Sequence, residues 1–124
     1  CNSITNDTGL AAGTYTPTLT NVTNVAASTA YQCQYMRVGN TVTVSGKIDI
    51  DPTASAATEL GVSLPIASNF ANDYECAGCG SSSTVAREPI AIRADATNNR
   101  AAIAYIAVTT TNQTFFFTFT YTVI

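Results

Sequence analysis

Two runs of alternating residues, separated by Gly39-Asn40, constrain the fold of this chain more than any other feature. Residues 31–38 and 41–50 repeat with a period of two, which is the period of a β-strand. The two residues between them predict a tight hairpin turn with positive φ at its first position. This turn fixes the register of the predicted hairpin, which pairs Val38 with Thr41, Tyr35 with Val44, and Tyr31 with Ile48.

One face of this hairpin is apolar and the other is polar, as in an antiparallel sheet that is solvated on one side. We expect the apolar face to belong to the core; it consists of Tyr31, Cys33, Tyr35, Val42, Val44, Gly46, Ile48 and Ile50. Gly46 falls opposite Cys33, so the missing side chain leaves space for the sulfur or for a large neighbour. A β-bulge at Gly46 is the competing interpretation.

Further strands are predicted along the chain, and residues that favour helix are scarce. The predicted strands cover residues 13–21, 59–64, 85–94, 101–109 and 114–124, and the last has one aromatic face made by Phe115, Phe117, Phe119 and Tyr121. Segments 51–58 and 67–84 lack a period and are predicted as loops. About seven antiparallel strands favour a β-sandwich or jelly-roll-like domain. We expect one such domain over 13–124, preceded by an arm or linker over 1–12.

The composition excludes several classes of function. The chain has 124 residues, no histidine and a formal net charge of −3. Without histidine it cannot build a Ser-His-Asp or Cys-His site, or a histidine-rich catalytic zinc site. Its five basic residues cannot form the cationic stripe that nucleic-acid binding requires. The sequence contains no run of about 18 apolar residues, which a membrane-spanning helix would require. A first residue other than Met suggests a fragment or a processed product.

Four segments, in this order, carry a resemblance to a known family. They are GTYTPTLT at 13–20, YMRVGNTVTVSG at 35–46, LPIAS at 64–68 and the closing FTYTVI. Together they resemble the terminal β-domain of tailed-phage fibre and virion structural proteins. The resemblance implies a trimeric all-β knob on the virion surface, beside other virion proteins. It implies no enzyme activity and no cofactor, and either attachment to a host glycan or protein or decoration of the capsid.

Four cysteines allow either disulfides or one metal site; they are Cys1, Cys33, Cys76 and Cys79. Convergence of all four on one ion is awkward, because Cys33 lies on the predicted core face and Cys1 at a terminus. A redox Cys-x-x-Cys motif needs a helix start in a βαβ unit, which is not predicted here. We therefore predict no metal site. We expect one or two structural disulfides, of undecided pairing, each stabilising by about 2–4 kcal/mol.

Two predicted loop tips carry residues suited to binding a ligand. The candidates are Asn72, Asp73, Tyr74 and Glu75 at the first tip, and Asn99 and Arg100 at the second. An aromatic ring beside amides and carboxylates can stack on a sugar and form hydrogen bonds with it. The alternative is a plain polar loop with Phe70 packed beneath it.

Exposed apolar residues are candidates for subunit contact, because a thin core cannot hide both faces of the last strand. We expect Met36, Phe116 and Ile124 in such contacts.

Three further interpretations of single residues stay open. Asp49 and Asp51 could serve as the paired acids of a glycoside hydrolase, although carboxylates at a strand end are usually solvated. Asp49, Asp51 or Asp95 could take part in a calcium site, although no ordered ligand loop is visible. Cys1 fits the lipid-bearing first residue of a bacterial surface lipoprotein.

Overall fold

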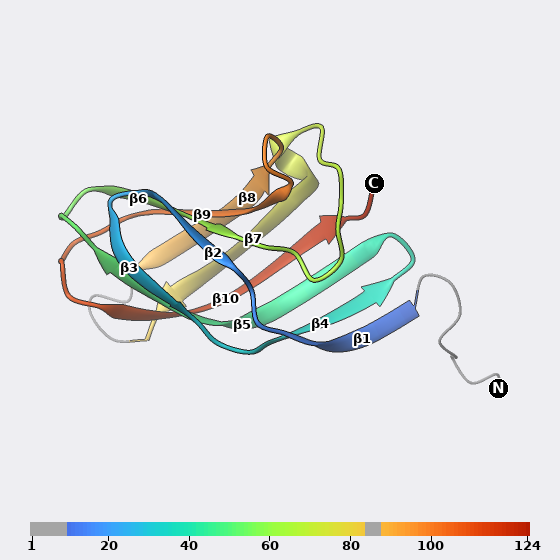
Figure 1. Ribbon diagram of the computed structural model, residues 1–124, viewed down its shortest axis with the longest axis horizontal. Coiled ribbons are helices and arrows are strands. Elements are labelled where there is room, and N and C mark those ends of the chain that lie inside the picture. Colours follow the sequence, from blue (N-terminus) through green and yellow to red (C-terminus); the bar gives the residue numbers. More distant parts are fainter. Residues whose placement is uncertain (1–9, 84–87) are drawn as a thin grey trace.

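The computed structural model describes residues 10–83 and 88–124, which fold into one antiparallel β-sheet curled into a half-barrel (Figure 1). In chain order the elements are β1 (Leu10–Tyr15), β2 (Leu19–Thr23), β3 (Val25–Ala30), β4 (Cys33–Val38), β5 (Thr41–Pro52), β6 (Ala57–Val62), the single 3₁₀ turn η1 (Asp73–Glu75), β7 (Cys76–Ser82), β8 (Pro89–Asp95), β9 (Arg100–Ile106) and β10 (Gln113–Thr122). The predicted all-β, antiparallel class is confirmed.

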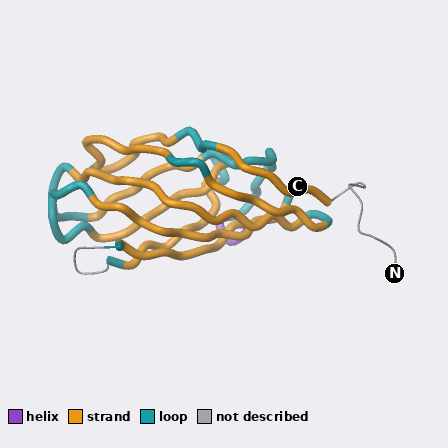
Figure 2. Tube along the Cα trace, turned by 90° about the horizontal axis from the view of Figure 1, so that it is seen from below, coloured by secondary structure: helices purple, strands orange, loops and turns teal. Residues whose placement is uncertain are grey.

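The strands follow the order β1-β4-β5-β10-β7-β8-β9-β6-β2 in one continuous sheet, and β3 pairs with the second half of β5. The curl brings distant parts of this sheet together. The Tyr15 hydroxyl at the end of β1 donates to the Ser63 carbonyl after β6 (3.0 Å), and Ser28 of β3 donates to Asn21 of β2 (2.8 Å). Figure 2 shows the resulting elongated, curled sheet, with loops gathered at its ends.

Strand β10 supplies the aromatic part of the core, and the predicted aromatic face is confirmed as buried: Phe115, Phe117, Phe119 and Tyr121. The rings of Phe117 and Phe119 stack with centroids 5.9 Å apart. The Tyr121 hydroxyl donates to the Ile66 carbonyl (2.7 Å) and accepts from the Ile66 N–H (3.1 Å). Tyr121 therefore ties the segment after β6 to the opposite side of the core.

Strand β7 lies beside β10 and carries small residues on its inward side. Gly78 pairs with Phe119, and Gly80 pairs with Phe117. A Cβ at Gly78 would overlap the Thr118 carbonyl oxygen and the Phe119 side chain, so the close approach of the two strands requires glycine there. The prediction of a loop over 67–84 is therefore wrong for β7, because the small residues that this position needs carry no alternating apolar pattern.

The predicted hairpin is confirmed in β4 and the first half of β5. Val38 pairs with Thr41, and Tyr35 pairs with Val44. Gly39 has a φ of 63°, which is the positive value that the first position of this turn requires.

The start of the hairpin shows one confirmed detail and one correction. A Cβ on Gly46 would overlap the Cys33 sulfur, so the glycine does make space for the thiol. The predicted pairing of Tyr31 with Ile48 is wrong, because Ile48 pairs with Ala30 of β3 instead. Tyr31 falls in the short gap between β3 and β4, where it is exposed rather than part of the core.

Other predicted boundaries also differ from the structure. The strand predicted over 13–21 is divided into β1 and β2 around Pro17, which has no N–H to donate to a ladder. Residues 10–12, expected in the arm, belong to β1. Strand β3 was not predicted, because its Ala, Ser and Thr residues show no apolar alternation. Residues 1–9, with Cys1, and residues 84–87 lie outside the described chain.

Candidate functional site

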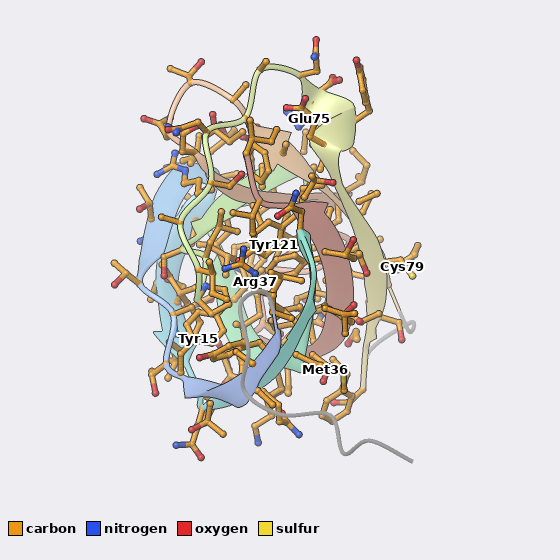
Figure 3. The ribbon with its side chains drawn as sticks, turned by 90° about the vertical axis from the view of Figure 1, so that its right-hand side faces the viewer. Tyr15, Met36, Arg37, Glu75, Cys79 and Tyr121 are labelled. Carbon is orange, nitrogen blue, oxygen red and sulfur yellow. The ribbon has the colours of Figure 1, made fainter. Side chains whose placement is uncertain are left out.

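A tight turn over 71–75 presents the first predicted tip just before β7. The Glu75 carboxylate accepts hydrogen bonds from the backbone N–H groups of Asn72 (2.9 Å) and Ala71 (2.6 Å). These two bonds hold the pKa of Glu75 below its usual value. Figure 3 shows Glu75 at the end of the molecule, above the core. Glu75 and Asn72 are thus committed to shaping the turn.

Asp73 and Tyr74 are the residues that this turn offers to solvent. Tyr74 is 76% exposed, which is unusual for a large aromatic side chain. Within residues 10–83 and 88–124, neither side chain makes a hydrogen bond or an ion pair. Both are therefore available to a ligand.

The second predicted tip is the turn between β8 and β9. Asn99 has a φ of 53°, and its side-chain oxygen accepts from the Phe70 N–H (2.9 Å). Arg100 donates through Nε to Asp95 (2.9 Å), and both side chains are mostly buried. Burial alone would raise the pKa of Asp95, but hydrogen bonds from Asn98 and Arg100 hold it below its usual value.

Phe70 joins the two tips beneath the surface. Its ring is buried and meets Tyr121 edge to face, with centroids 5.9 Å apart, while its N–H binds Asn99. Phe70 thus packs beneath the loop, as the alternative interpretation of a plain polar loop predicts. Because Tyr121 belongs to β10, the two tips rest on the core rather than only on each other.

A shallow hollow of about 440 Å³ opens where the two tips meet the outer side of β6 and β8. We call it the loop-end hollow; its lining residues are Val22, Glu59, Asp73, Arg93, Ala94, Asp95, Ala96, Thr97, Asn98 and Arg100. Arg93 approaches Glu59 at 3.8 Å, and the Arg93 side chain is about half exposed. This loose pair leaves the guanidinium of Arg93 able to bind another acceptor.

The chemistry of the loop-end hollow suits a hydroxyl-rich ligand. Its three carboxylates accept hydrogen bonds, and its guanidinium groups and the Asn98 amide donate them. Tyr74, which follows Asp73 in the chain, exposes an aromatic ring to solvent but does not itself line the hollow.

The predicted site residues fall into two groups. Four of them make hydrogen bonds within the chain that shape the two turns: Asn72, Glu75, Asn99 and Arg100. The exposed side chains of Asp73 and Tyr74 make none among the described residues. The sequence-based search missed Glu59 and Arg93, which complete the hollow. Both are charged residues at outward positions of strands. Such residues occur on any solvated strand, so the sequence gives no reason to single these two out.

The three cysteines in the described part of the chain do not gather into one site. Cys33, Cys76 and Cys79 each carry a free thiol, and no cluster of metal-ligating residues occurs within residues 10–83 and 88–124. Cys76 faces the core and burial raises its pKa to about 12, while Cys79 is exposed on the other side of β7. Figure 3 shows Cys79 pointing away from the sheet. A disulfide between Cys76 and Cys79 is therefore ruled out by the strand geometry.

Asp49 lies on the outward side of β5 within its own hydrogen-bond network. It accepts from Thr114 (2.6 Å) and from the Tyr31 hydroxyl (2.9 Å). Burial would raise the pKa of Asp49, but hydrogen bonds from Thr114, Tyr31 and Asn112 hold it below its usual value. A glycosidase acid needs a raised pKa, so this environment does not suit that role.

The three candidates for subunit contact are all exposed, and two of them share a face. Met36 (56% exposed) and Phe116 (54% exposed) both lie on the outward side of the sheet, on β4 and β10. Ile124 follows β10, and its N–H donates to the Ser68 hydroxyl (3.0 Å). The other large aromatic side chains of β10 are buried, so Phe116 accounts for the exposed aromatic surface of that strand.

Comparison with known proteins gives no relative for this chain. No family model matches it, and neither a curated protein nor a solved structure matches it significantly. Among the described residues, no helix has the length and apolar character needed to cross a membrane.

Proposed function

We propose that this chain is a non-enzymatic structural module of a tailed-phage particle. In this proposal it forms a jelly-roll-like, homotrimeric knob on the virion surface and attaches the particle to a glycan or protein of the host surface. The resemblance of the GTYTP, RVGNTVTVSG and FTYTVI segments to phage fibre domains supports the class of particle. The loop-end hollow supports attachment.

The observation that carries attachment is the meeting of two separate loop tips at one polar hollow. Asp73 lines the hollow beside Asn98, although 25 positions of sequence separate them. The Asn99–Phe70 hydrogen bond and the packing of Phe70 on Tyr121 fix the tips to the core. Loops held by a rigid scaffold are the usual place for binding residues.

A glycan is the host component that this surface favours. Sugars offer hydroxyl groups to carboxylates and guanidinium groups, and an apolar face to an aromatic ring. Asp73 and Arg93 line the loop-end hollow and supply the two polar groups, and the exposed ring of Tyr74 follows Asp73 in the chain.

Retention of the purified chain on host bacteria, and on an array of bacterial surface polysaccharides, tests attachment. We expect Tyr74→Ala and Asp73→Asn each to lower retention at least tenfold, because both side chains are exposed and not needed by the fold. Asp51→Asn, which removes the same charge on β5, serves as the control.

Equal retention of the wild type and the two loop variants would overturn the role of the loop-end hollow. No retention of the wild type, together with tight association with capsids, would overturn attachment and support the decoration role. Release of reducing sugar from host polysaccharide would overturn the non-enzymatic proposal.

A further inference from the structure

One broad side of the sheet has a composition unlike the rest of the surface. Where the first half of β5 pairs with β10, six outward residues are hydroxyl-bearing and lie opposite one another: Thr41 with Thr122, Thr43 with Thr120, and Ser45 with Thr118. The outward sides of β1, β4 and β7 extend this surface on either side. We call the outward side of these five strands the threonine face.

Three of the six hydroxyl groups named above, those of Thr43, Thr118 and Thr120, already have partners within the chain. Thr43 and Thr120 share a hydrogen bond across the two strands (3.4 Å), and Thr118 donates to the Val44 carbonyl (2.9 Å). Burial of a polar group is costly mainly when it loses its partner. This face can therefore leave water at a lower cost than the loop-end hollow, where Asp73 has no partner of its own among the described residues.

Charged side chains are rare on the threonine face. Within the described residues of its five strands, Lys47, Asp49 and Asp51, all on β5, are the charged residues that point outward. Two of them are engaged: Lys47 lies 4.4 Å from the centre of the Tyr31 ring, and Asp49 accepts hydrogen bonds from Tyr31 and Thr114. Depletion of charge is characteristic of the buried centre of protein interfaces.

The same face carries exposed apolar side chains. Met36 and Val38 lie on β4, and Phe116 lies on β10, each more than half exposed. Two of these three are the residues that the sequence singled out for subunit contact.

The size of the threonine face fits a contact between folded subunits. Five strands about 4.8 Å apart, with outward residues about 6.8 Å apart along each strand, give an area on the order of 600 Å². A standard interface takes about 800 Å² from each partner. Most of the required area is therefore available on this one side of the sheet.

We propose that the threonine face is the surface through which copies of this chain pack against one another. This inference rests on the self-association included in the proposed function and adds the face that mediates it. A second copy is the favoured occupant, because two chains of net charge −3 repel least through a broad side whose outward charges are one Lys and two Asp, a net charge of −1. The loop-end hollow then stays accessible to the host.

Introducing a charge into the threonine face tests the proposal. The mass of the assembly is measured by light scattering after gel filtration. Thr120→Arg places a charge at the centre of the threonine face and is expected to turn the oligomer into a monomer. Thr20→Arg places the same charge on an exposed threonine of β2, outside this face, and is expected to leave the oligomer intact.

Cys79 offers a second test that needs no substitution. It points outward from β7 and is exposed in the single chain. In the wild-type oligomer we expect iodoacetamide to label Cys79 at least tenfold more slowly than in the urea-unfolded chain, as followed by peptide mass mapping. Cys33 and Cys76, which are buried in each subunit, mark the folded state.

The outcomes separate this inference from the proposed function. An oligomer that survives Thr120→Arg, or whose Cys79 reacts as fast as in the unfolded chain, overturns the threonine face but leaves the trimer and the attachment site standing. A wild type that stays monomeric overturns both the face and the trimer. Loss of host retention in Tyr74→Ala bears on attachment alone.

Discussion

The threonine face and the loop-end hollow belong to the same curled sheet but use hydrogen bonds in opposite ways. On the threonine face, the side chains at the centre bond within the chain: Thr43 with Thr120, and Thr118 with the Val44 carbonyl. At the loop end, Glu75 and Asn99 bond to backbone N–H groups and leave Asp73 free. The threonine face is thus suited to burial against another protein surface without water, and the loop-end hollow is suited to binding a hydrated, polar ligand.

Strand β7 supports both surfaces, which explains why its packing is so restricted. It follows η1 directly, so its position sets that of the first tip, and its outward side extends the threonine face. Its inward glycines let it approach β10 closely.

The largest effect is therefore expected from Gly78→Val. The new side chain would overlap β10 and should destabilise the fold by about 3 kcal/mol, disturbing self-association and binding together. Urea denaturation measures the change. Ala91→Val, on the exposed side of β8, is the control and should stay within about 0.5 kcal/mol of the wild type. An unchanged midpoint for Gly78→Val would contradict the packing of β7 on β10.

Asn99→Ala should affect the loop end alone. It places a side chain without αL preference at φ 53° and removes the acceptor for Phe70 N–H, a combined cost of about 1–2 kcal/mol. Asn99→Gly tolerates the same φ and should cost less. We expect host retention to fall in Asn99→Ala, while the mass of the oligomer in light scattering stays constant. A change in oligomer mass would mean that the two surfaces are coupled.

Acid should loosen the first tip through Glu75. Its pKa lies below the ordinary value of 4.5, because the folded turn donates two N–H groups to the carboxylate. This contribution is complete above pH 4.5 and is lost as the pH falls through the lowered pKa. The amide resonances of Ala71 and Asn72 should shift in that acidic range in NMR spectra. Glu75→Gln should abolish the titration; its persistence would assign it to another group.

The smallest effect is expected from Cys79→Ser. The thiol is exposed and unpaired in the single chain, so the midpoint of urea denaturation should move by less than about 0.5 kcal/mol. A loss of about 2–4 kcal/mol would instead indicate a structural disulfide at Cys79, as the sequence first suggested.

Strands with strict alternation could be predicted from the sequence, and strands without it could not. The β4–β5 hairpin and the aromatic side of β10 follow directly from local pattern and turn chemistry. Strand β7 does not, because Gly78 and Gly80 are explained only by the aromatic residues of β10, more than 35 positions away. The conformation of β7 is determined by its packing against β10 rather than by a local sequence pattern.

The candidate site could be predicted only as separate pieces. Asp73 and Tyr74 were recognisable as polar and aromatic residues in a loop, and Asn99 as a turn residue. Their meeting depends on Phe70 and on the order of strands in the sheet. Arg93 could not be assigned, because nothing local distinguishes it from a solvated strand residue.

Native mass spectrometry of the wild-type chain at micromolar concentration tests the central claim most directly. If the knob uses one surface for its own copies and keeps the other for the host, the spectrum should show an assembly of three chains of 12.9 kDa each. A spectrum that contains only the single 12.9 kDa chain would contradict the account.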